Sequence, residues 1–227
     1  MNIQGLQEMT LVDVPGHVAA TVFLSGCDLR CPYCHNAELW DGDAPAVMDD
    51  AAFFDFLERR RGFLDAVCIT GGEPLLRADL ADFLRGIQDR GYFVKLDTNG
   101  THPEKLAALI DQGLVDSVAM DIKNSPSRYA ETAGRAIDVN AIFKSVALLR
   151  QKMPQVIFRT TVTGRLHDDE SFEEIGQWLA GASLFHLQPF RISAHVPDPT
   201  LGEPQSEDLL RYQRILRRTI AQVEIRG

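Results

Sequence analysis

The stretch Cys27-Asp-Leu-Arg-Cys31-Pro-Tyr-Cys34-His-Asn36 contains three of the chain's four cysteines within eight positions. Their spacing is C-x3-C-x2-C, and thiolates spaced this closely on a short loop are typical ligands of iron–sulfur clusters. Three ligands are one fewer than a cubic 4Fe–4S cluster usually takes. Such a site leaves one iron without a protein ligand, and that iron can bind a small molecule directly.

Two other interpretations of the cysteines stay open on the spacing alone. Zinc could be held by the three cysteines with His35, or with Cys68, as the fourth ligand. Disulfide bonds are less favoured, because the chain does not open with a secretory signal peptide. Cys68 lies inside an apolar run and is predicted to be a small buried side chain instead of a ligand.

Length and composition predict a single globular domain over residues 1–227. Apolar residues make up 45% and charged residues 24% of the chain, and no apolar run approaches the 18 residues of a membrane span. We therefore expect a cytoplasmic protein without a membrane partner. The net charge of −9 argues against a general nucleic-acid binder.

Short β-branched runs alternate with amphipathic helical stretches along the chain. The predicted strands are 18–24, 65–70, 92–97, 116–121, 156–161 and 184–188. The predicted helices are 50–61, 79–90, 103–113, 137–151, 169–180 and 206–218. This βαβ alternation indicates a parallel sheet with right-handed crossovers. Six such units fit either a doubly wound sheet or an incomplete (β/α) barrel.

Several predicted strands carry polar residues at every second position, so that one face of the strand is polar. These residues are Thr70, Lys95, Asp97, Asp121, Lys123, Arg159, Thr161, His186 and Gln188. Strands that are covered on both faces are normally almost continuously apolar. The pattern favours a cavity that holds a polar ligand, and the alternative is an internal network of ion pairs such as Lys95 with Asp97.

Each predicted strand is followed by a short motif. The motifs are the cysteine loop, Gly71-Gly72-Glu73-Pro74, Asp97-Thr98-Asn99-Gly100, Asp121-Ile122-Lys123, Thr161-Val162-Thr163-Gly164 and Gln188-Pro189-Phe190-Arg191. All of them fall at carboxyl ends of parallel strands, where open α/β sheets and β/α barrels bind their ligands.

Some of these motifs also allow a purely structural interpretation. Gly71 and Gly72 could bring backbone N–H groups close to a ligand, although a tight turn after a strand needs glycine in any case. Asp97 and Asp121 could accept hydrogen bonds from a ligand or bind a monovalent cation, or they could cap the following loops. The histidines other than His35 lie outside the motif loops, and we predict loop or surface positions for His17, His102, His167 and His195.

Taken together, the motifs resemble those of the radical S-adenosylmethionine (SAM) superfamily, and more closely those of the activating enzymes of glycyl radical enzymes. Within that family the chain resembles the long form of the anaerobic ribonucleoside-triphosphate reductase activating protein. The resemblance extends from about Gly5 to Arg191. The segments that carry it are Asp13–Gly16, Cys31–Asn36, Ile69–Pro74, Lys95–Gly100 and Val118–Lys123.

The resemblance implies that Cys27, Cys31 and Cys34 hold one 4Fe–4S cluster, whose open iron is chelated by SAM. The positions that match SAM contacts are Tyr33, His35, Gly71, Gly72, Glu73, Asp97, Thr98, Asp121 and Lys123. Some relatives also bind a monovalent cation near the methionine and ribose. Arg191 is near a position that is histidine in pyruvate formate-lyase activators, and this departure weakens an assignment to that substrate.

The implied fold is a partial (β/α)6 barrel. The implied reaction begins with flavodoxin or ferredoxin reducing the cluster, and it ends with a 5′-deoxyadenosyl radical taking a hydrogen atom from a glycine of the partner enzyme. That glycine loop would enter over Ser193–Gln205. The alternatives are a different glycyl radical enzyme as partner, a small-molecule substrate as in 7-carboxy-7-deazaguanine synthase, and a non-catalytic zinc-binding adaptor.

Overall fold

The computed structural model describes residues 2–43 and 45–226. The chain forms two compact units, each described here by itself. The first unit comprises Met1–Asp28, Glu38–Thr98 and His102–Val118. The second unit comprises Leu29–Ala37, Asn99–Thr101 and Ala119–Gly227. The prediction of a single domain is not tested by this division.

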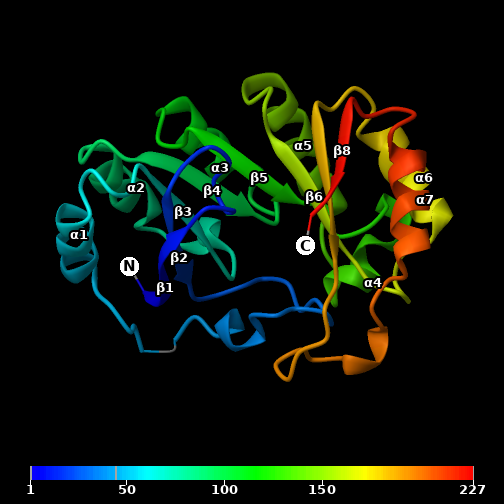
Figure 1. Ribbon diagram of the computed structural model, residues 1–227, viewed down its shortest axis with the longest axis horizontal. Coiled ribbons are helices and arrows are strands. Elements are labelled where there is room, and N and C mark those ends of the chain that lie inside the picture. The colour runs from blue at the N-terminus through cyan, green and yellow to red at the C-terminus, as the bar shows by residue number, and fades with distance from the viewer. Residues whose placement is uncertain (1, 44, 227) are drawn as a thin grey trace. The chain divides into compact units, whose positions relative to one another are not determined.

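The first unit is built on strands in the order β1 (Ile3–Thr10), β2 (Ala19–Leu24), β3 (Ala66–Gly71) and β4 (Phe93–Thr98) (Figure 1). Strands β2, β3 and β4 run parallel, as predicted, and β1 lies antiparallel beside β2. The predictions missed β1. Residues 7–9 of this strand are exposed, so it lacks the apolar run that marks a fully covered strand.

The helices of the first unit are α1 (Asp50–Arg59), α2 (Leu80–Gln88) and α3 (Pro103–Asp111), and a short 3₁₀ turn, η2, spans Pro74–Leu76. The carboxylate of Asp49 caps α1 by accepting the N–H of Ala52 at 2.8 Å. Phe53 of α1 packs against Phe83 of α2 with ring centroids 5.3 Å apart. Buried aromatic pairs of this kind hold the helices against the unit's core.

In the second unit the strand order is β5 (Ser117–Asp121, of which residues 119–121 belong to this unit), β6 (Ile157–Val162), β7 (Leu184–Pro189) and β8 (Gln222–Ile225), all parallel. The helices are α4 (Tyr129–Ala133), α5 (Val139–Lys152), α6 (Asp169–Trp178) and α7 (Ser206–Leu216). Short 3₁₀ turns lie at η3 (Pro126–Arg128) and η4 (Pro199–Leu201), and a further one, η1, spans Ala37–Trp40. The predictions missed α4 and β8.

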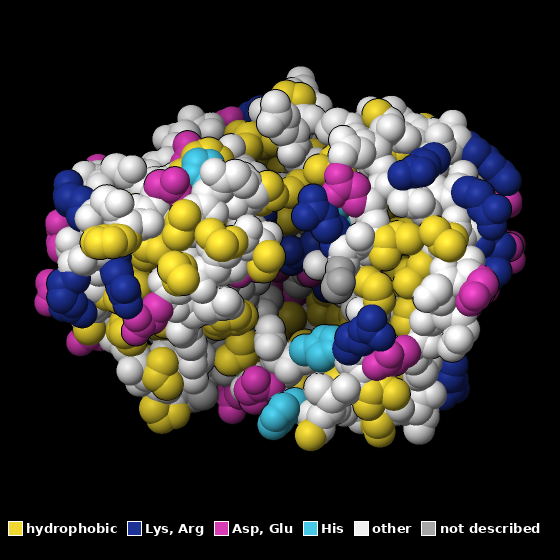
Figure 2. Space-filling view, viewed as in Figure 1, with side chains coloured by type: hydrophobic (Ala, Val, Ile, Leu, Met, Phe, Trp, Pro, Cys, Tyr) yellow, Lys and Arg dark blue, Asp and Glu magenta, His cyan; other side chains and the backbone are white. Residues whose placement is uncertain are grey.

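The six predicted strands are confirmed within one residue at each end, and the six predicted helices within two residues. Among residues 2–43 and 45–226, no helix is both long enough and apolar enough to cross a membrane. Figure 2 shows acidic, basic and hydrophobic side chains interspersed on the face that it displays. The Asp and Glu side chains that give the sequence its negative net charge are therefore not gathered into one patch on this face.

Candidate functional site

The turn that follows β3 packs directly on the backbone that leads into the cysteine loop. A Cβ on Gly71 would lie 2.3 Å from backbone atoms of Leu24, and Gly71 has a φ of 121°. A Cβ on Gly72 would lie 2.1 Å from the carbonyl oxygen of Gly26 and 3.3 Å from Cβ of Cys27. Both positions therefore require glycine, because the neighbouring atoms are main-chain atoms that cannot move aside.

The N–H groups of this turn are already used within the first unit. Gly72 donates to the carbonyl oxygen of Leu24 at 2.8 Å, and Glu73 donates to that of Gly26 at 2.7 Å. These contacts agree with the structural interpretation, in which a tight turn after the strand needs glycine. The use of Gly71 and Gly72 in binding a ligand stays a prediction.

Glu73 joins the ends of two strands in the first unit. Its side chain is fully buried, and Oε1 accepts hydrogen bonds from the N–H of Leu75 at 3.0 Å and from Oγ1 of Thr98 at 2.9 Å. Glu73 thereby caps η2 and ties the turn after β3 to the end of β4. A buried carboxylate with several donors is fixed in position, as a ligand-binding group must be.

Asp97 and Lys95 form an ion pair on β4, with side chains only 10% and 3% exposed. Lys95 Nζ also lies 3.8 Å from Sγ of Cys68. Cys68 is fully buried in β3, which confirms its prediction as a small core side chain. The sequence allowed two interpretations of the polar residues on β4: a face that lines a ligand cavity, or an internal ion pair. The structure favours the ion pair of Lys95 with Asp97.

The cysteine loop enters the second unit at Leu29. The N–H of Arg30 donates to the carbonyl oxygen of Ala133 in α4 at 2.9 Å. The N–H of Cys34 donates to the carbonyl oxygen of Cys31 at 3.0 Å, which closes a turn between these two cysteines. Cys31 is buried and Cys34 is half-buried, and none of the four cysteines, all of which lie in the described ranges, forms a disulfide bond.

Within residues 2–43 and 45–226, no group of three or more His, Cys, Asp or Glu side chains is arranged to hold a metal ion. Cys27 belongs to the first unit, whereas Cys31 and Cys34 belong to the second. The three-cysteine ligand set therefore stays a prediction. Cys31 and Cys34 lie close enough for a thiolate on Cys34 to raise the pKa of Cys31, as two ligands of one site would.

The His35 ring is fixed by one hydrogen bond to the backbone of the same unit. Its Nε2 lies 2.7 Å from the carbonyl oxygen of Arg191, and because a carbonyl only accepts, Nε2 must carry the proton. A protonated ring nitrogen cannot ligate a metal, so only Nδ1 could do so. The other proposed fourth ligand, Cys68, is enclosed in β3. The burial of Cys68 weakens the zinc site that includes it, whereas the His35 contact leaves Nδ1 available and does not decide between zinc and iron–sulfur.

Cys31 and Tyr33 share an electrostatic environment with Lys123. Burial raises the pKa of the Cys31 thiol, and the positive charge of Lys123 opposes that rise. Burial also raises the pKa of Tyr33, which is 4% exposed. The Tyr33 hydroxyl lies near enough to the Cys31 sulfur to lower its pKa, but the contact falls short of a full hydrogen bond. The Tyr33 hydroxyl is thus a buried polar group that lacks a full hydrogen bond within the described residues.

Asp121 at the end of β5 contacts two cations. Oδ2 accepts from Nζ of Lys123 at 2.9 Å, and Oδ1 accepts from Nε of Arg159 on β6. Burial alone would raise the pKa of Asp121, but the charges and hydrogen bonds of Arg159 and Lys123 hold it well below its ordinary value. The charges therefore favour the ionised carboxylate, and hydrogen bonds fix it at both oxygens.

His167 lies in the loop between β6 and α6, as one of the two predicted positions requires, but it is not a surface residue. It is 4% exposed, its Nδ1 accepts the N–H of Thr163 at 3.2 Å, and its Nε2 donates to the carbonyl oxygen of Lys123 at 3.0 Å. The ring stacks on Phe172, and burial lowers its pKa to about 4. His167 therefore fixes the backbone of Lys123 as a neutral imidazole.

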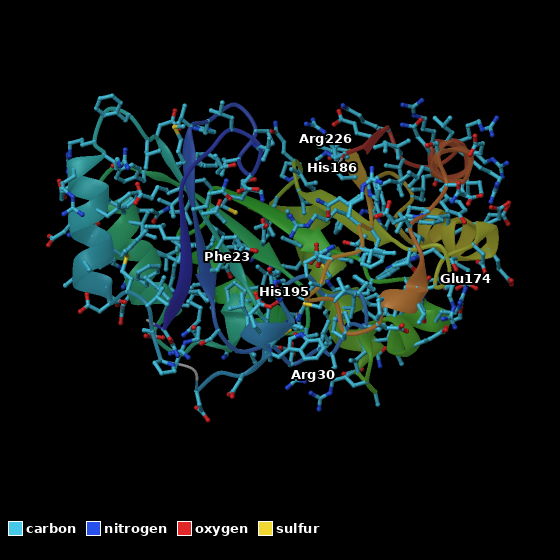
Figure 3. All side chains as sticks on the ribbon, turned by 60° about the horizontal axis from the view of Figure 1, so that its bottom comes forward. Phe23, Arg30, Glu174, His186, His195 and Arg226 are labelled. Atoms are coloured by element: carbon cyan, nitrogen blue, oxygen red, sulfur yellow. The ribbon has the colours of Figure 1, made fainter. Side chains whose placement is uncertain are left out.

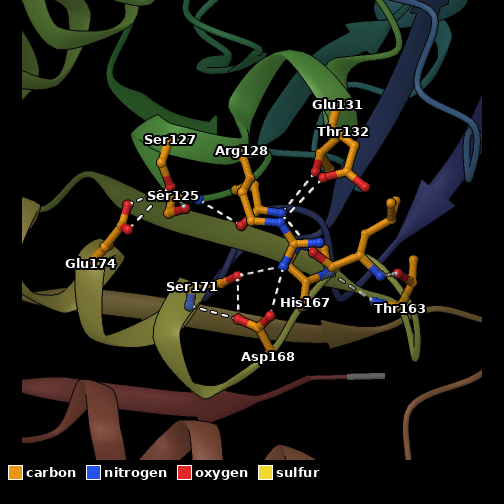
Figure 4. A network of polar contacts seen from close by, with 12 residues as sticks. Ser125, Ser127, Arg128, Glu131, Thr132, Thr163, His167, Asp168, Ser171 and Glu174 are labelled. Carbon is orange, nitrogen blue, oxygen red and sulfur yellow. Dashed lines mark hydrogen bonds and ion pairs between the residues drawn. The ribbon is translucent and has the colours of Figure 1, made fainter.

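A polar network surrounds His167 (Figure 4). Arg128 donates to the carboxylate of Asp168 at 2.8 Å, and that carboxylate caps α6 by accepting the N–H of Ser171 at 2.8 Å. The Asn124 amide, next to Lys123, donates to the carbonyl oxygen of Leu166 at 2.8 Å. The chain after β5 is thus bound to the chain after β6 at Lys123, Asn124 and Arg128.

Arg191 directs its side chain toward the surface. The side chain is 69% exposed and donates to Oε2 of Glu203 at 2.7 Å. Its backbone carbonyl accepts from His35, and further along the same segment the N–H of Asp198 donates to the carbonyl oxygen of Pro32 at 2.9 Å. The segment from Arg191 to Asp198 is therefore anchored at two points on the cysteine loop. A contact between the Arg191 side chain and SAM stays a prediction.

Sequence comparisons identify known relatives of the chain. The model of the radical SAM superfamily matches residues 21–179. A protein of Methanocaldococcus jannaschii named "Putative glycyl-radical enzyme activating enzyme MJ1227" is 32% identical over 234 residues, covering 99% of this chain and 95% of the relative. The pyruvate formate-lyase 1-activating enzyme of Escherichia coli K12 is 27% identical over 185 residues, covering 78% of this chain and 74% of the relative.

Solved structures show the same fold at low sequence identity. SuiB of Streptococcus suis bound to its precursor peptide SuiA superposes with a TM-score of 0.72 at 14% identity, covering 91% of this chain and 48% of SuiB. SuiB bound to S-adenosylmethionine gives a TM-score of 0.69 at 14% identity, covering 91% of this chain and 52% of that chain. The chain thus spans about half of SuiB, and the likeness extends to the fold alone.

Proposed function

This chain belongs to the radical SAM superfamily and to its family of glycyl radical enzyme activating enzymes, and from that premise we propose its cofactor ligands and its partner. The observation that carries the assignment is the relative that matches 99% of the chain at 32% identity. The fold is the partial barrel of this superfamily, and membership implies a 4Fe–4S cluster and SAM.

The proposed cluster ligands are Cys27, Cys31 and Cys34. In the second unit, the turn that joins Cys31 to Cys34 supports this assignment, and so does the charge of Lys123, which favours the Cys31 thiolate. In the first unit, Cys27 follows Gly26, whose carbonyl oxygen is held by the N–H of Glu73. The donor set suits an iron–sulfur cluster, because thiolates are its usual ligands.

We assign the SAM contacts residue by residue from the family motifs. Tyr33 and His35 would meet the adenine. The turn of Gly71, Gly72 and Glu73 would receive the methionine amino group, and because an ammonium is a donor, the occupied N–H groups of this turn do not compete with it. The remaining proposed contacts are Asp97, Thr98, Asp121, Lys123 and Arg191.

When bound and reduced, the cluster and SAM would supply the radical chemistry for removing a hydrogen atom from a glycine Cα of the partner. This chain's residues position the reactants and exclude water. The ion pairs of Asp121 and the hydrogen bonds of Glu73 hold these two carboxylates in fixed positions before a ligand binds. Flavodoxin or ferredoxin is the proposed electron donor.

The proposed partner is the anaerobic ribonucleoside-triphosphate reductase. The support is the set of motifs from Asp13–Gly16 to Val118–Lys123, which resemble the activators of that enzyme. A pyruvate formate-lyase is the second candidate, because curated relatives from Escherichia coli and Clostridium pasteurianum are named as its activators. Arg191 in place of the histidine of those activators favours the first candidate.

Anaerobic reconstitution tests the proposal. The reduced protein incubated with SAM should release methionine and 5′-deoxyadenosine, and no release would overturn the reaction. Addition of purified anaerobic reductase should produce a glycyl radical signal in electron paramagnetic resonance, and a signal with pyruvate formate-lyase alone would select the second candidate. Cleavage of SAM without a signal from either partner would favour a small-molecule substrate.

Matched cysteine variants test the ligand set. Cys34→Ser should lose the brown cluster chromophore and its acid-labile sulfide, whereas Cys68→Ala, which alters a buried cysteine outside the loop, should retain both. Stoichiometric zinc without sulfide in the wild-type protein would instead support the adaptor.

A further inference from the structure

Four ionisable residues occupy one level across the strands of the second unit. Asp121 of β5 is in register with Arg159 of β6, Arg159 with His186 of β7, and His186 with Glu224 of β8. Residues in register on parallel strands point to the same face of the sheet. We call these four residues the charge row.

The side chains of the charge row are joined in pairs. Arg159 donates to Asp121, and Nε2 of His186 lies 3.5 Å from Oε2 of Glu224, a contact that is longer than a full hydrogen bond. Arg226 then contacts Oε2 of Glu224 at 2.6 Å. Figure 3 labels His186 and Arg226, which lie next to each other at the end of this row.

Arg159 is consequently not a freely rotating surface arginine. Its side chain is 18% exposed, and it lies between Asp121 and His186 in register on the neighbouring strands. Lys123 contacts the other carboxylate oxygen of Asp121. Both oxygens of this carboxylate thus accept hydrogen bonds from cations that belong to the chain itself.

This arrangement does not suit a bound monovalent cation. Such an ion needs carboxylate oxygens with uncompensated negative charge, since hard cations are bound by oxygen ligands. Asp121 already faces two positive charges, and Asp97 in the first unit is paired with Lys95. A solute cation would have to displace a tethered one, which would leave that charge buried and uncompensated.

We propose that Arg159 is the built-in counter-cation of Asp121, and that this protein therefore needs neither sodium nor potassium to bind SAM. Arg159 is a positioning residue that acts through Asp121, and the charge row holds it in place. The consequence for SAM rests on the proposed function, in which Asp121 belongs to the SAM site.

A cation-exchange experiment on the reconstituted holoprotein tests this proposal. The dissociation constant for SAM is measured by equilibrium dialysis in sodium, potassium and tetramethylammonium chloride at equal ionic strength. The wild-type values should agree within twofold. Arg159→Met should bind SAM at least tenfold more weakly in tetramethylammonium, and potassium or sodium should restore part of this loss. A purely structural role would show no such restoration.

Two further variants control for charge and for folding. Arg159→Lys keeps a positive charge and should remain independent of the alkali cation. Arg165→Met removes an exposed arginine from the same unit, whose guanidinium contacts Thr200, and should behave as the wild type. Cation dependence in Arg165→Met that equals that of Arg159→Met would overturn the proposal.

A measurement without SAM or cluster separates this proposal from the proposed function. Thallium(I) mimics potassium, and ²⁰⁵Tl resonance broadening reports its specific binding to the wild-type apoprotein. No saturable broadening would support the built-in counter-cation, and saturable broadening would overturn it, even if Arg159→Met failed to fold. Failure of the wild type to bind SAM in every buffer would overturn the proposed function and leave the thallium result standing.

Discussion

The N–H of Glu73 donates to the carbonyl oxygen of Gly26 at 2.7 Å, so the turn after β3 is bonded to the residue before Cys27. Gly72→Ala would place a Cβ 2.1 Å from that same oxygen. We expect a loss of about 1–3 kcal/mol in unfolding free energy, typical of overpacking, together with a lower iron content after reconstitution. Chemical denaturation and iron analysis measure the two effects.

Gly5→Ala is the control for that substitution. Its Cβ would meet Phe23 at an ordinary contact distance of 3.5 Å, and Gly5 also lies in the first unit, on β1. Iron content in Gly5→Ala should match the wild type. Equal iron content in Gly72→Ala would show that the turn does not support the cysteine loop.

Thr98 donates to the buried carboxylate of Glu73 at 2.9 Å. Thr98→Val keeps the shape and removes the donor, so we expect it to lower the unfolding free energy by about 1.5–3 kcal/mol, typical of a hydrogen bond to a charged group. Thr98→Ser should recover most of this loss. A double-mutant cycle with Glu73→Gln measures the pair, and a coupling energy of zero would contradict the contact.

Gly134 has a φ of 72°, and its Cβ would lie 1.9 Å from the carbonyl oxygen of Arg30. Gly113 has a φ of 68° and nothing within 4 Å of its Cβ. Alanine at either position should cost about 1–2 kcal/mol for the left-handed backbone. Gly134→Ala should lose additional stability and cluster content, because its Cβ would displace the backbone of Arg30 in the cysteine loop. Equal thermal midpoints for the two variants would argue against that displacement.

His167 should make stability depend on pH between about 4 and 6.5. Its folded-state pKa of about 4 lies below its ordinary value of 6.5, so the unfolded chain binds more protons in this interval. The contribution of the neutral ring is complete above pH 6.5 and is lost as the pH falls toward 4, by up to about 3 kcal/mol.

Urea denaturation of the wild type and of His167→Gln across this interval measures the effect. The glutamine amide can still accept from Thr163 or donate to Lys123 but does not titrate near pH 5. The variant should therefore show a shallower pH dependence than the wild type. Parallel curves for the two proteins would contradict the assignment of the acid sensitivity to His167.

Apolar runs between helices were enough to predict the parallel strands. Residues 67–69 of β3 are fully buried, so the apolar residues Val67, Cys68 and Ile69 follow one another without a polar residue between them. β1 could not be found in this way, because Gln7 and Glu8 face solvent, and β8 has only four residues. Both strands become recognisable only once a neighbouring strand supplies their hydrogen bonds.

The site was predictable where a motif fixes the backbone and unpredictable where partners come from distant segments. Gly71 and Gly72 were identified because a turn after a strand restricts its residue types. The burial of His167 was not predicted, because it depends on Phe172 and on the carbonyl of Lys123, 44 positions away. Arg159 was noticed as a polar strand residue, but its pairing with Asp121 follows only from the strand register.

The two anchors between the cysteine loop and the segment from Arg191 to Asp198 have a practical consequence for handling the protein. The span between them includes exposed Ile192, His195 and Pro197, which a contaminating protease can reach. A single cut there would leave the two anchoring residues, Arg191 and Asp198, on different fragments. The cysteine loop would then no longer be held by one continuous segment, although the strands and helices would stay intact. Intact-mass spectrometry of each preparation should therefore come before any conclusion that a poorly loaded sample is inactive.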